Sequence, residues 1–230
     1  MVTQLPSNGT PPGALCDTSG MLVIHRVLRR RYAAMPALVD DVATGDLDRA
    51  AVVAAHVTEF TEMLHAHHET EDTHLWGVLE SRSPACTLHV ELMRSQHRAV
   101  AALLARLGGL LPEWRRTADP ALRSAVVEVL GEVNTALGIH LGAEESRILP
   151  VAAVTMTQRE WDAFGDLGRK SVPKARLLVQ LGYVLEAIDP SQRAHWMRAN
   201  LPGPVRGLYA VAGRRQFVND YRRVFRTEPS

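Results

Sequence analysis

Two segments of the sequence place a histidine and a glutamate four residues apart, as His67-x-x-x-Glu71 and His140-x-x-x-Glu144. In an α-helix, positions i and i+4 lie about 40° apart around the axis and about 6 Å apart along it, so both side chains point to the same side. Imidazole nitrogens suit iron, copper or zinc, and carboxylates can bridge two metal ions and offset their charge. Each segment therefore predicts part of a metal site if it is helical.

A single histidine precedes each of these segments at nearly the same distance. His25 lies 42 residues before His67, and His97 lies 43 residues before His140. The chain thus contains two copies of one arrangement, a helix with one histidine followed by a helix with HxxxE. In a bundle, six side chains from these segments would converge on the axis, and the predicted metal ligands are His25, His67, Glu71, His97, His140 and Glu144.

The size of this set bears on the metal. A structural zinc ion takes four ligands, so one zinc would be over-supplied, whereas two iron ions need about this set with a bridging oxygen and water. The alternative is that these residues are ordinary core or surface side chains on amphipathic helices. Burying four imidazoles and two carboxylates without partners costs several kcal/mol, so a metal pair is the simpler explanation.

The spacing of apolar residues predicts the helices that would position the ligands. Apolar side chains recur every three or four residues from Met21 to Leu38, and Gly45-Asp46 reads as a stop followed by an N-cap. Further long helices are expected at about 47–79, 85–110 (ending at Gly108-Gly109) and 121–149 (stopped by Pro150). Strand-like alternation and hairpin turns are absent from the sequence. The predicted fold is all-α, an up-down-up-down four-helix bundle.

Three parts of the chain are expected. Residues 1–17, rich in Pro and Gly, predict a disordered leader, and residues 18–152 predict the bundle. Residues 156–230 predict a C-terminal helical extension with helices at about 158–169, 173–187 and 191–200 and a last one from near Pro204. Thr157 and Glu160 fit a capping box at its start.

Composition excludes several classes of protein. The 230 residues contain 26 Lys and Arg against 25 Asp and Glu, a net charge of +1, which argues against nucleic-acid binding through general basic charge. No apolar run approaches the roughly 20 residues that span a bilayer, and the N-terminus lacks a signal-peptide pattern. Cys16 and Cys86 form no disulfide framework, so a cytoplasmic location is expected. The oligomeric state is left open.

These motifs resemble the hemerythrin-like family, the HHE cation-binding domain. Residues 67–72 (HHETED) are similar to the family's first HHxxE(D) segment, and residues 140–145 resemble its second. The resemblance covers about residues 18–152. It implies an up-down-up-down four-helix bundle with a non-haem di-iron centre, two iron ions joined by carboxylates and a bridging oxygen species. It also implies chemistry with dioxygen, peroxide or nitric oxide, or iron sensing.

The sequence departs from the oxygen-carrying members of that family. Those proteins have a second histidine one turn from the histidine of the third helix, but Met93 and Ala101 occupy the positions four residues from His97. The resemblance therefore favours peroxide decomposition, nitric oxide handling or sensing over reversible oxygen carriage. The expected function is a di-iron oxidoreductase acting on small oxidants, and the alternative is an iron- or oxygen-responsive sensor without turnover. Glu144 matches the spacing of the first repeat better than Glu145.

For the other histidines and for Tyr32, the sequence predicts roles outside the main set of ligands. His68 and Asp72 form an i, i+4 pair that either orients the ligands or lies on an exposed polar face. Tyr32 lies on the face of His25, with core packing as the simpler role. His74 either lines an entrance or caps the core, His56 is too far along its helix to share a metal ion, and His65, His89 and His195 are expected to be structural or solvated. A ferritin-type ExxH motif (Glu71, His74) lacks the required second copy.

Overall fold

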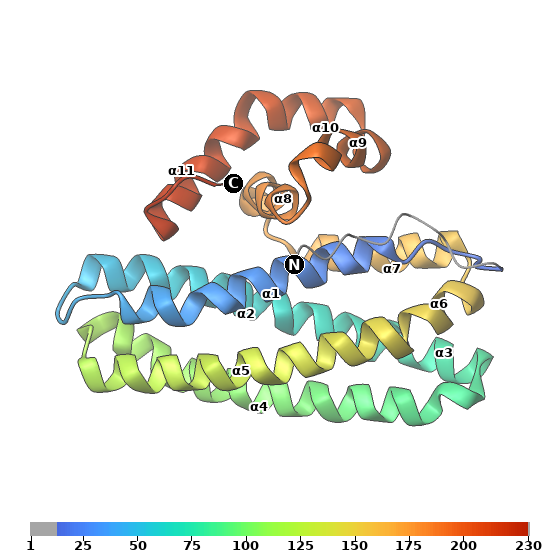
Figure 1. Ribbon diagram of the computed structural model, residues 1–230, viewed down its shortest axis with the longest axis horizontal. Helices are drawn as coiled ribbons and strands as arrows, with labels where there is room; N and C mark the ends of the chain where they lie inside the picture. The colour runs from blue at the N-terminus through green and yellow to red at the C-terminus, as the bar shows by residue number, and fades with distance from the viewer. Residues whose placement is uncertain (1–12, 230) are drawn as a thin grey trace.

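The computed structural model describes residues 13–229, and over these residues the chain is helical and contains no β-strand. Four long helices of this described part lie side by side: α1 (Ser19–Asp40), α2 (Leu47–His74), α4 (Thr87–Thr117) and α5 (Pro120–Arg147) (Figure 1). Helices α1 and α4 each pack against both α2 and α5. The prediction of an all-α fold is confirmed.

Helix α4 is longer than predicted at its C-terminal end. It continues through Gly108, Gly109 and Pro112 and ends at Thr117, where Ala118 takes a left-handed conformation with φ of 46°. The low helix propensity of these residues is offset by packing, because Leu107, Leu111 and Trp114 continue the buried apolar face of the helix. The prediction of an end at Gly108-Gly109 was therefore wrong.

The helices that carry the HxxxE segments are interrupted just after them. Helix α2 ends at His74 and is followed by α3 (Trp76–Arg82), and α5 ends at Arg147 and is followed by α6 (Leu149–Thr155). Pro150 lies in the first turn of α6, where proline is tolerated because its missing N–H needs no partner there. A short 3-10 turn (Pro84–Cys86) then leads from α3 into α4. The helix predicted at 47–79 is thus divided in two. The helix predicted at 121–149 ends at Arg147, and Pro150, predicted to stop it, lies in the first turn of the next helix.

The C-terminal part is a series of shorter helices. Helix α7 (Gln158–Ser171) begins with the predicted Thr157–Glu160 capping box and packs against α2. A 3-10 turn (Lys174–Arg176) leads into α8 (Leu177–Glu186), which packs on α1, and α9 (Pro190–Asn200) and α10 (Gly203–Leu208) follow. A π-helical segment (Tyr209–Gly213) joins α10 to α11 (Arg214–Phe225), which packs on α8 and α2. Figure 1 shows α8 to α11 stacked over α1 and α2.

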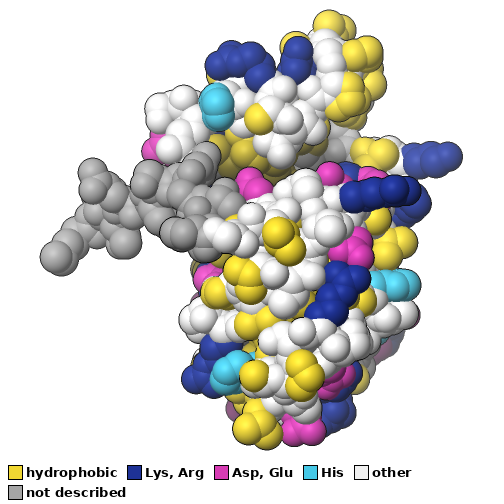
Figure 2. Space-filling view, turned by 90° about the vertical axis from the view of Figure 1, so that its right-hand side faces the viewer, with side chains coloured by type: hydrophobic (Ala, Val, Ile, Leu, Met, Phe, Trp, Pro, Cys, Tyr) yellow, Lys and Arg dark blue, Asp and Glu magenta, His cyan; other side chains and the backbone are white. Residues whose placement is uncertain are grey.

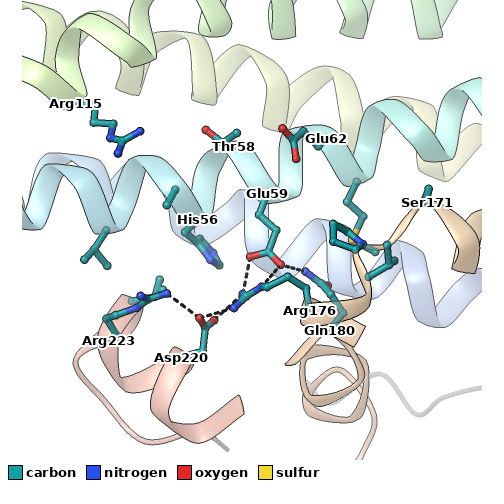
Figure 3. A pocket seen from close by; sticks show the side chains of 16 residues that line it. His56, Thr58, Glu59, Glu62, Arg115, Ser171, Arg176, Gln180, Asp220 and Arg223 are labelled. Carbon is teal, nitrogen blue, oxygen red and sulfur yellow. Dashed lines mark hydrogen bonds and ion pairs between the residues drawn. The ribbon is translucent and has the colours of Figure 1, made fainter. Parts of the chain in front are cut away.

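An ionic network joins α2 to these C-terminal helices, and we call it the junction (Figure 3). Arg176 bonds Glu59 through two nitrogens, at 2.8 and 2.6 Å, and bonds Asp220 at 2.9 and 3.1 Å. The Tyr183 hydroxyl donates to Asp220 at 2.9 Å, and the Gln180 amide donates to Glu59 at 2.5 Å. The network lines a cavity of about 490 Å³. Each charge of the junction therefore has a partner of opposite sign.

The described end of the predicted leader is packed against the bundle. Residues 1–12 lie outside the described residues. The N–H groups of Leu15 and Cys16 donate to the carbonyl of Ala153 at 2.6 and 3.2 Å, and Cys16 is buried. Because Cys16 joins an apolar cluster that includes Leu149 and Ala152, the prediction of disorder does not hold for residues 13–17.

Two clusters of buried apolar side chains lie one beyond the other along the bundle. The predicted ligands on α2, α4 and α5 fall between them in the sequence of each helix. The flanking pairs are Leu64 on α2 and Leu75 directly after it, Val100 and Met93 on α4, and Leu137 on α5 and Ile148 directly after it. The site is therefore a polar layer with dry, apolar layers on both sides.

The exterior of the described part of the chain carries charges of both signs. On the face shown in Figure 2, positive and negative side chains are interspersed, in keeping with the near-zero net charge. Within residues 13–229, every helix is too short or too polar to cross a bilayer.

Candidate metal centre

Each long helix contributes to the polar layer between the apolar clusters. Helix α2 is the main contributor, and the HxxxE segment of α5 faces it. All of these side chains are buried except that of His67, which is 11% exposed. The contributed residues are His25 from α1, His67, His68 and Glu71 from α2, His97 from α4, and His140 and Glu144 from α5.

The layer divides into two groups of side chains with the geometry of metal ligands. In each group, every residue offers one ligand atom, and these atoms lie within 4.8 Å of one another. One group offers two imidazoles and two carboxylates, and the other offers three imidazoles. The first is His25, His67, Glu71 and Glu144, and the second is His68, His97 and His140.

The Glu71 carboxylate faces both groups. Its Oε1 lies 3.2 Å from His67 Nε2 in the first group, and its Oε2 lies 3.4 Å from His97 Nε2 in the second. Each oxygen is thus directed at a different group, which is the arrangement of a carboxylate that bridges two cations.

Glu144 also lies between the two groups, but a single one of its oxygens is close to both. Its Oε2 lies 3.3 Å from His25 Nε2 and 3.7 Å from His140 Nε2. In the second group the Nε2 atoms of His97 and His140 face each other at 3.3 Å. The HxxxE repeat therefore places one carboxylate from α2 and one from α5 between the two sets of imidazoles.

Within the described part of the chain, seven buried atoms of this layer have no hydrogen-bond partner. They are Nε2 of His25, His67 and His68 and both carboxylate oxygens of Glu71 and Glu144. Each unsatisfied buried polar group costs about 1–3 kcal/mol, and more if it is charged. Because all seven converge on one region and all are metal donors, the donor set fits a pair of cations.

The outer nitrogens of three rings are held by polar side chains. His25 Nδ1 donates to Glu145 at 2.9 Å, and His97 Nδ1 donates to Asp72 at 2.8 Å. His140 Nδ1 lies 3.3 Å from the amide oxygen of Gln96. Such contacts fix the tautomer in which Nδ1 carries the proton and Nε2 presents a lone pair to the centre.

Burial keeps four of the five imidazoles neutral. It lowers the pKa of His67 to about 3 and that of His140 to about 4, and neighbouring imidazoles act in the same direction. Burial also lowers the pKa of His68 and of His97. Neutral imidazole is the form that binds metal ions, so these rings need lose no proton at neutral pH.

The remaining imidazole and the two carboxylates share the protons of the centre. Burial disfavours the charged form of His25, but Glu144, helped by Glu145, raises its pKa to about 9. Burial, and then the charge of Glu144, raise the pKa of Glu71 well above its usual value. Burial acts to raise the pKa of Glu144 as well, but His25 and the other imidazoles lower it to about 2. A cation bound here would therefore displace protons from His25 and Glu71.

The six residues predicted from the repeat all lie in this layer, and His68 joins them. For His68 the sequence predicts an orienting role or an exposed position, but the residue is 6% exposed and its Nε2 points into the second group. Neighbouring helical residues differ by about 100°, which normally sends them to different surroundings. The adjacent pair His67-His68 could have indicated that His68 is also a ligand. In a site with two groups of ligands, two neighbouring histidines that point in different directions can each join one group.

Two acidic residues next to the HxxxE glutamates lie outside the layer. Glu145 binds His25 Nδ1 and also accepts from Arg29 at 2.5 Å. Asp72 binds His97 rather than its i+4 partner His68. Of the two glutamates left open by the sequence, Glu144 faces the centre and Glu145 orients a ring.

The other residues weighed from the sequence lie elsewhere. The Tyr32 hydroxyl donates to the carbonyl of Phe60 at 3.4 Å inside the apolar core. His56 is buried at the junction, against Phe60, Tyr183 and Phe225. His65 and His74 are exposed, and His89 is half-buried, so the ExxH motif does not form an internal site.

Comparison with known proteins assigns the chain to a family. A family model described as the hemerythrin HHE cation-binding domain matches residues 18–167, more than half of the chain. Searches of curated proteins and of solved structures give no match. The family match ends inside α7, beyond residue 152, where the sequence analysis ends the bundle. The chain belongs to the hemerythrin HHE cation-binding family.

Proposed function

We propose that this chain binds two iron ions in the polar layer and reacts with small oxidants such as peroxide, dioxygen or nitric oxide. The observation that carries the proposal is the convergence of seven buried nitrogen and oxygen atoms that lack hydrogen-bond partners within residues 13–229. Imidazole and carboxylate without thiolate is a ligand set that suits iron. The proposal includes the up-down-up-down order of α1, α2, α4 and α5 expected for a hemerythrin-like bundle.

The two positions differ in the ligands that this chain would supply. One ion would be held by His25 and His67, and the other by the three imidazoles of the second group. Glu71 and Glu144 would bridge both positions and balance charge. The position with two imidazoles has fewer protein ligands, so it is the position with room for a small oxidant or water.

When bound, a pair of iron ions supplies one-electron steps between the ferrous and ferric states. The chain holds the ions, fixes the ring tautomers through Glu145, Asp72 and Gln96, and keeps bulk water away with the apolar layers. Peroxide, dioxygen and nitric oxide are small and need no shaped recognition pocket. Reactivity would therefore be set by the ligands and the dry surroundings.

The direct test is anaerobic reconstitution with ferrous iron, followed by metal quantification, an optical spectrum and addition of hydrogen peroxide. We expect two irons per chain, a ferric absorption band and oxygen evolution. Less than one equivalent of metal would reject the metal centre. Two equivalents without oxygen evolution would reject peroxide decomposition and leave nitric oxide or dioxygen binding as the reaction to assay.

Two histidines of α2 provide a matched pair of variants. His67 offers Nε2 to the first group, whereas His65, two residues earlier, is exposed. His67→Ala is expected to lower the iron content to about one ion per chain or less, and His65→Ala is expected to leave it unchanged. Equal iron content in both variants would contradict the assignment.

A run of three arginines on α1 favours sensing as a second candidate function. Arg29 binds Glu145, the partner of the His25 ring, while Arg30 and Arg31 bind Glu186 of α8 at 3.0 and 2.9 Å. Contacts of the centre and of the C-terminal helices are thus made by consecutive residues of one helix. A shift of α1 on metal binding would therefore move the arginines that bind Glu186 and alter the packing of α8.

Limited proteolysis separates this second function from the first. A sensor predicts that cleavage after residue 156 differs between the metal-free and iron-loaded forms. The difference should shrink in Arg30→Gln, which loses the bonds from one of the two arginines that contact Glu186. Identical cleavage of both forms of the unmodified chain would reject sensing through these helices.

A further inference from the structure

A hydrogen-bonded path leads from the candidate metal centre to a buried tryptophan. Oδ1 of Asp72 accepts from His97 Nδ1 at 2.8 Å and from Trp76 Nε1 at 2.7 Å. The Trp76 ring is fully buried, and its centroid lies 5.7 Å from that of the His97 ring. A single carboxylate oxygen thus joins an indole to an imidazole whose other nitrogen faces the centre.

This connection has chemical consequences for the indole. Tryptophan is among the side chains most easily oxidised by one electron, and loss of that electron makes its N–H strongly acidic. A carboxylate 2.7 Å away can take the proton as the electron leaves, which lowers the cost of oxidation. The remaining link, from Asp72 to His97, gives the electron a short path into the centre.

The path also reaches the surface. The side chain of Asp72 is 43% exposed, although both of its ring partners are buried. A small reductant in solution can therefore approach the path without entering the polar layer.

A second buried tryptophan lacks all of these features. Trp114 is also fully buried, but its Nε1 has no hydrogen-bond partner among residues 13–229. It packs in the apolar cluster at the other end of α4, far along the helix from His97. Trp114 thus serves as an internal control with equal burial and no connection to the centre.

We propose that Trp76 is a redox side chain that passes one electron to the oxidised metal pair through Asp72 and His97. The inference rests on the proposed function, since the metal pair is the electron acceptor. When bound, the pair would supply two electrons to peroxide, which with two protons gives two molecules of water. Trp76 would then supply one electron to the oxidised pair, and its N–H proton would move to Asp72. A one-electron reductant of the thiol or ascorbate class would return the electron to the indole, and Asp72 would return the proton.

The test uses the full iron-loaded chain and limiting hydrogen peroxide. Freeze-quenched samples are examined by electron paramagnetic resonance for an organic radical, and peptides are mapped by mass spectrometry for oxygen added to tryptophan. We expect a tryptophan radical and oxidation at Trp76, with Trp114 unmodified. The metal-free chain treated in the same way should show neither.

Three variants assign the signal. Trp76→Phe should abolish the radical, and Trp114→Phe should leave it unchanged. Asp72→Asn keeps the indole and a hydrogen-bond acceptor but cannot take the proton, so we expect the radical yield to fall about tenfold or more. If Trp76→Phe does not fold, Asp72→Asn at equal iron content decides the question.

The outcomes separate this inference from the proposed function. A chain that binds less than one equivalent of iron overturns both. A loaded chain that shows the ferric band but no radical, or shows oxidation at Trp114 to the same extent as at Trp76, overturns the role of Trp76 alone. An unchanged radical yield in Asp72→Asn at full iron content overturns the path through Asp72.

Discussion

The candidate metal centre and the junction both hold several ionisable side chains close together, but the two regions satisfy them in opposite ways. At the junction, Arg176 lies between Glu59 and Asp220, and Tyr183 completes the bonding of Asp220. In the centre, Glu71 and Glu144 have no hydrogen-bond partner for any of their oxygens within the described residues. Paired charges at the junction hold two parts of the chain together, whereas convergent donors without hydrogen-bond partners are the arrangement of a cation site.

His56 shows why convergence matters as well as the lack of a partner. Both of its ring nitrogens are buried without a hydrogen bond within residues 13–229. Its ring lies among Phe60, Tyr183 and Phe225, and no other metal donor is directed toward it in the described groups. A single unpartnered imidazole is kept neutral by burial, while seven unpartnered donor atoms that converge on one region could hold metal ions.

The largest expected effect is on the centre, when its metal is removed. A ligand that binds the folded chain alone stabilises it by about 4 kcal/mol at a thousandfold excess over its dissociation constant. Chelation of the iron-loaded chain should therefore lower the melting temperature by about 10 °C in calorimetry. Asp220→Ala should show the same drop on chelation, because Asp220 belongs to neither group of candidate metal ligands. A melting temperature that does not change when the chelator is added would contradict the assignment of a metal site to the polar layer.

The next largest effect is expected at the junction. Asp220→Ala removes one partner of Arg176 and the acceptor of the Tyr183 hydroxyl. Because Arg176 is partly exposed and keeps Glu59, we expect a loss of about 2–3 kcal/mol in the free energy of unfolding, measured by urea titration. Iron content should not change. Loss of iron in this variant would show that the two regions are not independent.

The pH dependence of stability should carry a signature of His56. Burial lowers its pKa to about 3, while the unfolded chain titrates near 6.5, so the unfolded state binds more protons as the pH falls below 6.5. Stability should fall by about 2 kcal/mol between pH 7 and pH 5 from this residue. The charged neighbours that act on it are Arg31, Asp220, Arg176 and Arg49.

His56→Leu isolates this contribution. Urea titrations of the metal-free variant and the metal-free parent chain should diverge as the pH falls, with the parent losing stability faster. Parallel curves would show that His56 is protonated or solvated in the folded chain.

The smallest expected effect has the opposite sign. Glu71→Leu replaces a buried carboxylate without hydrogen-bond partners in the described residues by an apolar side chain of similar size. In the metal-free chain this change should raise the free energy of unfolding by about 1–2 kcal/mol, while iron binding is lost. Destabilisation of the metal-free variant would mean that Glu71 has a structural partner.

The sequence predicted more of the candidate metal centre than of the rest of the molecule. The HxxxE repeat is a local pattern, since four residues make one helical turn, so it predicted which side chains share a face. His68 was missed because adjacent helical residues normally face different surroundings. The helix break after His74 and the continuation of α4 past Gly109 depend on packing between helices, which the local pattern does not contain.

The junction could not be predicted from the sequence. Glu59 and Arg176 lie 117 residues apart, and Arg176 and Asp220 lie 44 apart, with no repeat to mark them. Their pairing depends on how α8 and α11 dock on α2. The Trp76–Asp72–His97 path could be predicted only in part from the sequence. Its Trp76–Asp72 bond is a local i, i+4 contact, whereas its Asp72–His97 bond joins two helices.

The most direct test of the central claim is anomalous diffraction at the iron edge from crystals of the iron-loaded chain. The account predicts two peaks, one among His25, His67, Glu71 and Glu144 and one among His68, His97 and His140, with both carboxylates between them. A single peak, or peaks outside the polar layer, would contradict it.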